Sequence, residues 1–127
     1  MDPTTQEHRN AKEAILKSEG WAVNPTVIHE AYHALVFKRK MLPKDARIKL
    51  HTLIRDRRTR FLNITRVISL YSMDLAVRFE LGGRDSLIVG CYMYNGVGRL
   101  LTHDRDLLRL KMIDLGGKNI LFIDPIV

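Results

Sequence analysis

The sequence has too little cysteine and too few long apolar runs for a disulfide-stabilised or membrane-spanning protein. Its only cysteine, Cys91, has no second cysteine to pair with, which fits a reducing compartment. No apolar run approaches the roughly 18 residues that a membrane-spanning helix needs. The chain begins Met1-Asp2-Pro3 rather than with a basic and then an apolar segment, so no secretory signal is visible. Together these absences predict a cytoplasmic protein without a membrane partner.

Acidic residues are also in deficit. Aspartate and glutamate number 14 against 21 lysines and arginines, which gives a formal net charge of +7. An excess of positive charge favours association with polyanions and makes nucleic acid the first candidate partner. The same cations would also keep an ordinary surface solvated, so composition alone does not separate the two interpretations.

Length and composition indicate one folded domain. The 127 residues, 46 % hydrophobic and 28 % charged, are typical of a compact domain with a single core. No repeat, low-complexity tract or linker interrupts the chain, so we assign residues 1–127 to a single domain.

Short apolar runs alternate with helical patterns along the chain. Thr4 and Glu7 form a capping box at the start of the first helix, and Gly20 ends it. We expect helices at residues 4–20, 26–40, 43–54, 66–81, 84–95 and 104–110, and strands at 21–24, 61–64, 99–102 and 120–123. This alternation predicts an α/β domain with a mainly parallel sheet flanked by helices.

Side chains with structural roles can also be assigned from the pattern. The helix at residues 66–81 is expected to have Thr65 as its N-cap and to bury Val67, Tyr71, Leu75 and Phe79. Cys91, Trp21 and Tyr32 are interpreted as core or interface residues, and His51 as a histidine on a helix surface.

Four acids follow strands or begin helices, which is where parallel sheets place their sites. Glu30 lies early in the second helix, Asp85 begins the helix after Gly82-Gly83, and Asp104 and Asp106 follow the strand at 99–102. Clustered carboxylates are the ligands that Mg²⁺ and Mn²⁺ require, and such an ion can activate water for phosphodiester cleavage. Taken singly, an acid near a helix N-terminus also stabilises that helix by about 0.3–1 kcal/mol without any catalytic role.

Four segments together resemble one known family. Residues 23–35 are VNPTVIHEAYHAL, residues 83–90 are GRDSLIVG, residues 101–107 are LTHDRDL, and the apolar run at 120–123 precedes Pro125. In order and approximate spacing they resemble the PIN-domain family over nearly the whole chain. His103 stands where the family usually has asparagine.

The resemblance implies a fold, a site and partners. The fold is a three-layer PIN-like α/β domain, and the activity is cleavage of RNA dependent on Mg²⁺ or Mn²⁺. Glu30, Asp85 and Asp104 would be the catalytic and metal-binding acids, with Thr102 and Asp106 in support. Many members are toxins of the VapC type, which are usually dimeric and are inhibited by an antitoxin.

The resemblance also implies that one strand is missing. PIN domains begin with an apolar strand ending in Asp-Thr-Asn, whose aspartate completes the metal site, and Asp2 at the chain terminus is a poor substitute. In the family's sheet that strand lies between those expected at 21–24 and 99–102, so its loss leaves backbone groups unpaired. We consider three explanations: the chain begins at an internal methionine of a longer protein, the flanking strands pair directly, or a partner supplies the strand.

Two alternative functions remain open. His29-Glu30-Ala31-Tyr32-His33 is a literal H-E-x-x-H motif, which on a helix can bind zinc in a metalloprotease, although the candidate third ligands, Asp45 and Glu80, have no signature around them. With one acid missing, the chain could instead be an inactive PIN-like module that binds RNA or protein. The candidate phosphate contacts are Lys38, Arg39, Lys40, Arg55, Arg57, Arg58 and Arg60.

Overall fold

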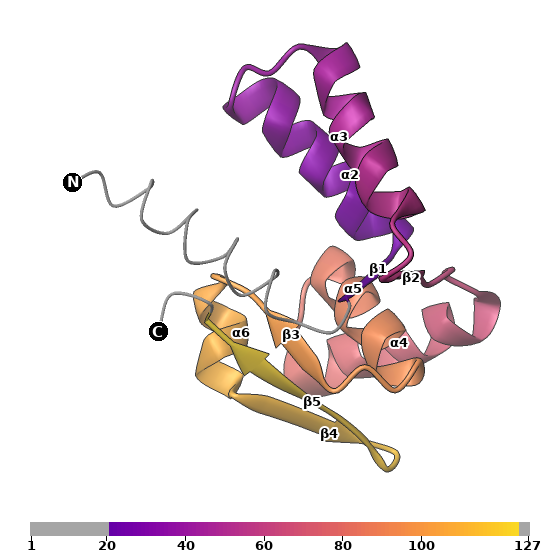
Figure 1. Cartoon of the computed structure of the whole chain (residues 1–127). Helices are drawn as coiled ribbons and strands as arrows, with labels where there is room; N and C mark the ends of the chain where they lie inside the picture. Colours follow the sequence, from indigo (N-terminus) through magenta and orange to yellow (C-terminus); the bar gives the residue numbers. More distant parts are fainter. Residues whose placement is uncertain (1–20, 125–127) are drawn as a thin grey trace.

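The computed structural model describes residues 21–124 of the chain (Figure 1). The helix expected at residues 4–20, its capping box and Asp2 lie outside the described residues. No helix of residues 21–124 is long and apolar enough to cross a membrane.

The described residues form alternating helices and short strands, as predicted. In chain order they are β1 (Trp21–Val23), α2 (Pro25–His33), the π-helix η1 (Ala34–Lys38), α3 (Pro43–Arg55), β2 (Thr59–Phe61), α4 (Arg66–Phe79), α5 (Gly83–Tyr94), β3 (Arg99–Leu101), α6 (Arg105–Leu110), β4 (Met112–Leu115) and β5 (Lys118–Ile123). Figure 1 shows α2, η1 and α3 as a helical hairpin that extends away from β3, β4 and β5.

The strands form two separate sheets rather than the single sheet that we expected. β1 pairs with β2 in parallel, with Trp21 opposite Thr59. In the second sheet β5 is central, with β3 parallel on one side and β4 antiparallel on the other. Direct pairing between β1 and β3 is therefore wrong for residues 21–124. Both strands nevertheless pack against the same core, through Ala22 of β1 and Leu100 of β3.

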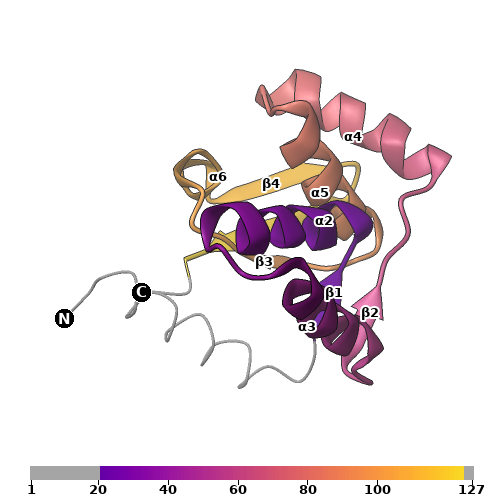
Figure 2. The ribbon, with the colours of Figure 1, turned by 90° about the horizontal axis from the view of Figure 1, so that it is seen from above.

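The main core is built around α5, which lies between α4 and the sheet of β3, β4 and β5 (Figure 2). Val89, Cys91 and Met93 of α5 are almost completely buried, which confirms the structural interpretation of Cys91. The Tyr92 hydroxyl donates a hydrogen bond to the Ala22 carbonyl at 3.1 Å and so connects α5 to β1. A second, smaller core is centred on Val23, Ile28 and Leu50 and lies between β1, α2 and α3.

Helix starts follow from local side-chain chemistry. The buried Asn24 side chain accepts a hydrogen bond from the Val27 amide at 3.0 Å, and Pro25 occupies the first turn, where its missing N–H costs nothing. This cap makes α2 begin one residue earlier than predicted. Thr65 caps α4 as predicted, with its hydroxyl accepting from the Ile68 amide at 3.3 Å.

Three local expectations were wrong. The strand expected at 61–64 is at Thr59–Phe61, because its pairing with β1 begins where the Trp21 amide bonds the Arg58 carbonyl. Val67 is 50 % exposed and Ile68 is buried in its place, whereas Leu75 is buried and Tyr71 and Phe79 pack against the core as predicted. Strand β4 was not predicted at all. It forms a hairpin with β5 through Gly116 and Gly117, whose φ angles of 63° and 78° suit a tight two-residue turn.

Candidate functional site

Three of the predicted acids lie near one another at the start of α5 and beyond the end of β3. The pKa of the Asp85 carboxyl is raised from its ordinary value of 3.8, first by burial and then by the negative charge of Asp104. Asp106 raises it further, while Arg84 acts in the opposite direction. Asp85, Asp104 and Asp106 are therefore electrostatically coupled, and we refer to them as the acidic cluster.

Asp104 is held in position by hydrogen bonds at the start of α6. One oxygen of its carboxylate, Oδ1, accepts from the Asp106 amide at 2.9 Å and from the Leu107 amide at 3.1 Å. Its own amide donates to the Thr102 hydroxyl oxygen at 3.0 Å. Thr102 and Asp106 therefore both help to fix Asp104. The helix-capping role that we weighed for Asp104 is present, and only one of its two oxygens is used in these bonds.

Glu30 reaches the same region through an ion pair. The Arg84 side-chain Nε lies 2.7 Å from Glu30 Oε1, and this pair joins α2 to the first turn of α5. The side chains of Arg84 and Glu30 are 72 % and 37 % exposed, so the pair is open to solvent. Arg84 was not singled out in the sequence, because nothing local links it to a glutamate 54 positions earlier.

The donor chemistry of these residues fits a hard divalent cation, although they do not enclose one. Among residues 21–124, no three Asp, Glu, His or Cys side chains are grouped closely enough to hold a metal by themselves. Mg²⁺ is usually held by one or two carboxylates together with several waters and substrate phosphates. Burial first and the charge of Asp104 second raise the pKa of Asp85, and a bound cation would offset both effects by stabilising the ionised carboxylate.

Comparison with known proteins identifies the family. The family model described as the PIN domain matches residues 4–112, which is most of the chain. The chain belongs to the PIN-domain family. PIN domains are generally nucleases that depend on divalent metal ions.

A solved structure supports the fold independently. The chain is similar to one in the crystal structure of VapBC2 from Rickettsia felis bound to a DNA fragment from their promoter. The similarity has a TM-score of 0.61 at 15 % sequence identity, and it covers 93 % of this chain and 84 % of that one. No curated protein gives a significant match. The predicted PIN-like α/β fold is thereby confirmed, with its described strands divided between two sheets.

The histidines of the H-E-x-x-H motif of this PIN domain have other neighbours. The His33 ring packs against the Phe37 ring at a centroid distance of 4.8 Å. His29 borders a groove between α2 and α3. Within residues 21–124, neither histidine joins a group of three candidate ligands, and so the zinc-protease alternative gains no structural support.

The predicted phosphate contacts lie on and beside the α2–α3 hairpin. Lys38, Arg39 and Lys40 are exposed at the end of η1, and Arg55 is exposed at the end of α3. Arg58 is already engaged: its guanidinium lies 3.3 Å from the Asp56 carboxylate and 4.5 Å from the centroid of the Trp21 ring. These contacts anchor Arg58 beside the small core.

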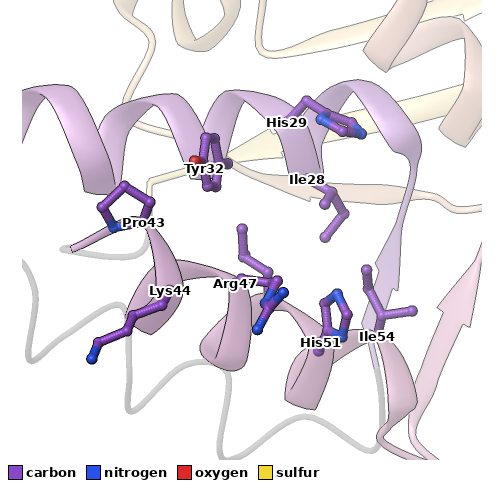
Figure 3. A pocket seen from close by; sticks show the side chains of 9 residues that line it. Ile28, His29, Tyr32, Pro43, Lys44, Arg47, His51 and Ile54 are labelled. Atoms are coloured by element: carbon purple, nitrogen blue, oxygen red, sulfur yellow. The ribbon is translucent and has the colours of Figure 1, made fainter. Parts of the chain in front are cut away.

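A groove between α2 and α3 was missed in the sequence. Its volume is about 510 Å³, and Figure 3 shows the side chains around it. The residues that line it are Ile28, His29, Tyr32, Pro43, Lys44, Arg47, Leu50, His51 and Ile54. A smaller hollow of about 310 Å³ adjoins it along α3 and shares Arg47 and His51. The only signal in the sequence was the recurrence of basic residues at helical spacing along α3.

Proposed function

We propose that this PIN domain cleaves RNA in a reaction that depends on Mg²⁺ or Mn²⁺. The observation that carries the proposal is the acidic cluster of Asp85, Asp104 and Asp106, together with Glu30 paired to the first turn of the same helix. The negative charges of Asp104 and Asp106 disfavour ionisation of Asp85, since like charges repel, so their placement costs stability at Asp85. Crowded carboxylates at the carboxyl end of a strand are instead expected of a cation site.

Each residue has a proposed part in this site. Glu30, Asp85 and Asp104 would hold the cation, which supplies a nucleophilic water and charge stabilisation at the phosphate. Thr102 and Asp106 keep Asp104 in place through backbone hydrogen bonds. Arg84 keeps Glu30 close to Asp85 and balances part of their charge. The basic residues of the hairpin, namely Lys38, Arg39, Lys40, Arg55, Arg57 and Arg58, would contact the RNA backbone.

The biological setting that we propose is a toxin–antitoxin pair. The similar Rickettsia felis chain belongs to a VapBC2 complex, and its structure includes a fragment of promoter DNA. By analogy, the chain would act in the cytoplasm as a homodimeric toxin inhibited by an antitoxin. The deficit of acids, with a formal charge of +7, suits both RNA and an acidic inhibitor.

The reaction can be tested through its products. If a water attacks the phosphate, the products carry no 2′,3′-cyclic phosphate, which distinguishes this reaction from cleavage by the neighbouring 2′-hydroxyl. Cleavage that requires Mg²⁺ or Mn²⁺, leaves no cyclic phosphate and is lost in Asp104→Asn is the expected result. Asp74→Asn, which changes an exposed acid on α4, is the matched control and should cleave normally. Cyclic products, or cleavage that persists in EDTA, would contradict the proposal.

A second candidate function is binding without cleavage. It is favoured by the finding that no three described acids group closely enough to hold a metal alone. In that case RNA affinity would fall steeply with salt, and no cleavage would occur at any metal concentration.

A further inference from the structure

Basic side chains form a line along α3 that continues from the groove into the adjoining hollow. Lys44 and Arg47 line the groove, His51 and Arg47 line both spaces, and Arg55 lines the hollow. Successive members are three or four residues apart, which corresponds to about 4.5–6 Å along a helix axis. All four are exposed. The spacing suits a chain of regularly repeated negative charges better than a single anion.

The groove also provides flat and apolar surfaces between these charges. Ile28 and Leu50 are nearly buried beneath it, and Tyr32 lines it from the α2 side. Figure 3 shows Tyr32 and Ile28 on α2 facing Arg47 and His51 on α3 across the open space. Rings beside a row of cations are the combination with which proteins bind single-stranded nucleic acid, since bases stack on rings while phosphates meet cations.

Charge complementarity identifies the ligand as a polyanion. Among residues 21–124, no acidic side chain lines either the groove or the hollow. An acidic peptide would also be attracted, but its carboxylates would need to repeat along more than one helical turn to meet the three cations Lys44, Arg47 and Arg55. A ribose-phosphate backbone carries one charge at every residue, so it matches a line of cations without any special sequence.

The groove lies beside the proposed cleavage site but is distinct from it. Ile28 and Tyr32 are one turn apart on the face of α2 that lines the groove. Glu30 is two residues from each, so a turn of about 200° places it on the other side of that helix, where it meets Arg84. His29 lies between the two sides. RNA in the groove would therefore be held a few nucleotides away from the acids.

We propose that the groove between α2 and α3 binds single-stranded RNA as an anchoring site, with Arg47 and His51 as its central contacts. The proposal rests on the proposed ribonuclease function for its choice of RNA. It adds a binding surface that is independent of the acids and of any metal ion.

The test is RNA binding under conditions where no cleavage can occur. Fluorescence anisotropy with a labelled single-stranded RNA of mixed sequence, in EDTA, gives Kd for the whole chain and its variants. Arg47→Ala should raise Kd roughly fivefold to tenfold and reduce the slope of log Kd against log salt by about 0.7, the value for one lost phosphate contact. Arg78→Ala, which removes an exposed arginine from α4, is the matched control and should change neither.

Further outcomes decide the proposal. RNA containing 4-thiouridine should crosslink to the segments that contain Tyr32 or His51, and crosslinks confined to other segments would overturn it. Unchanged RNA affinity in Arg47→Ala and in Arg47→Glu, with melting curves like those of the parent chain, would also overturn it. If Arg47→Ala leaves the Kd for RNA unchanged but weakens binding of a glutamate-rich helical peptide, the proposal is wrong and the groove binds a protein. Asp104→Asn distinguishes the two proposals. It should abolish cleavage, which tests the proposed function, and should leave RNA binding in EDTA unchanged, which tests the groove separately.

Discussion

Asp85 shows the conflict between stability and function at the scale of single residues. Burial and the negative charge of Asp104 both disfavour the ionised form of its carboxyl. Because the folded pKa lies above the ordinary value of 3.8, ionising Asp85 costs more in the folded chain than in the unfolded chain. Stability is therefore lost as the pH rises from 3.8 through the raised pKa.

Replacing Asp85 should stabilise the protein in the absence of metal. At pH 7 Asp85→Asn should raise Tm by about 1–4 °C, a small effect because the carboxyl is mostly solvent-screened. The gain should shrink as the pH falls below the raised pKa, where the parent carboxyl becomes increasingly protonated. Differential scanning calorimetry in EDTA measures this, with Asp74→Asn as the control that gains nothing. A lower Tm for Asp85→Asn at pH 7 would show that the cluster is not repulsive.

The residues that local rules govern could be predicted, and those set by distant contacts could not. Thr65 and Asp104 were assigned to helix starts because a capping side chain bonds amides two or three positions later. The ion pair between Arg84 and Glu30 could not be predicted, because its partners meet only after α2 and α5 have packed. Arg47 was missed because the groove exists only between two packed helices.

At the scale of elements, the packing of α4 against α5 depends on one glycine. A Cβ added at Gly90 would collide with the Ser72 hydroxyl and would lie 3.1 Å from Ser72 Cβ and 3.2 Å from its Cα. The Ser72 hydroxyl is buried and has no hydrogen-bond partner among the described residues. Helices α4 and α5 thus pack closely at Ser72, where the buried hydroxyl forms no hydrogen bond with the described residues.

Two substitutions test this close approach. Gly90→Ala should lower the free energy of unfolding by about 1–3 kcal/mol, because the Ser72 backbone itself must move. Ser72→Ala should be neutral or slightly stabilising, because it removes an unsatisfied hydroxyl. Chemical denaturation measures both, and the double variant should recover only part of the loss, since the added methyl group still presses on the backbone of residue 72. A neutral Gly90→Ala would mean that α4 and α5 are packed less closely.

Elements were predicted best where the periodicity is long. Helices α3, α4 and α5 were placed within a few residues, because their apolar positions recur over three turns or more. Strand β4 was missed because four residues between a helix and two glycines carry too short a pattern. In the stripe assigned to α4 only Val67 was wrong, since Val67 and Ile68 are equally apolar and the buried position is Ile68.

At the scale of the whole molecule, each of two strands has one edge without a partner among residues 21–124. Within this range β1 pairs only with β2 and β3 pairs only with β5. Both strands contact the core around α5, through Ala22 and Leu100. Unpaired edges are ready templates for a further strand. The family resemblance places an aspartate-bearing strand there, and we propose that such a strand completes both the sheet and the acidic site.

The central claim, that these acids support metal-dependent RNA cleavage, is tested most directly by one measurement. Cleavage of a mixed RNA by the purified chain should be followed with Mn²⁺ and with EDTA, for the parent chain, Asp85→Asn and the control Asp74→Asn. We predict cleavage only with Mn²⁺, at least about a hundredfold slower in Asp85→Asn and unchanged in the control. Equal rates in the parent chain and Asp85→Asn would contradict the assigned site. No cleavage by any of them, even at high protein concentration, would make this PIN domain a binding module.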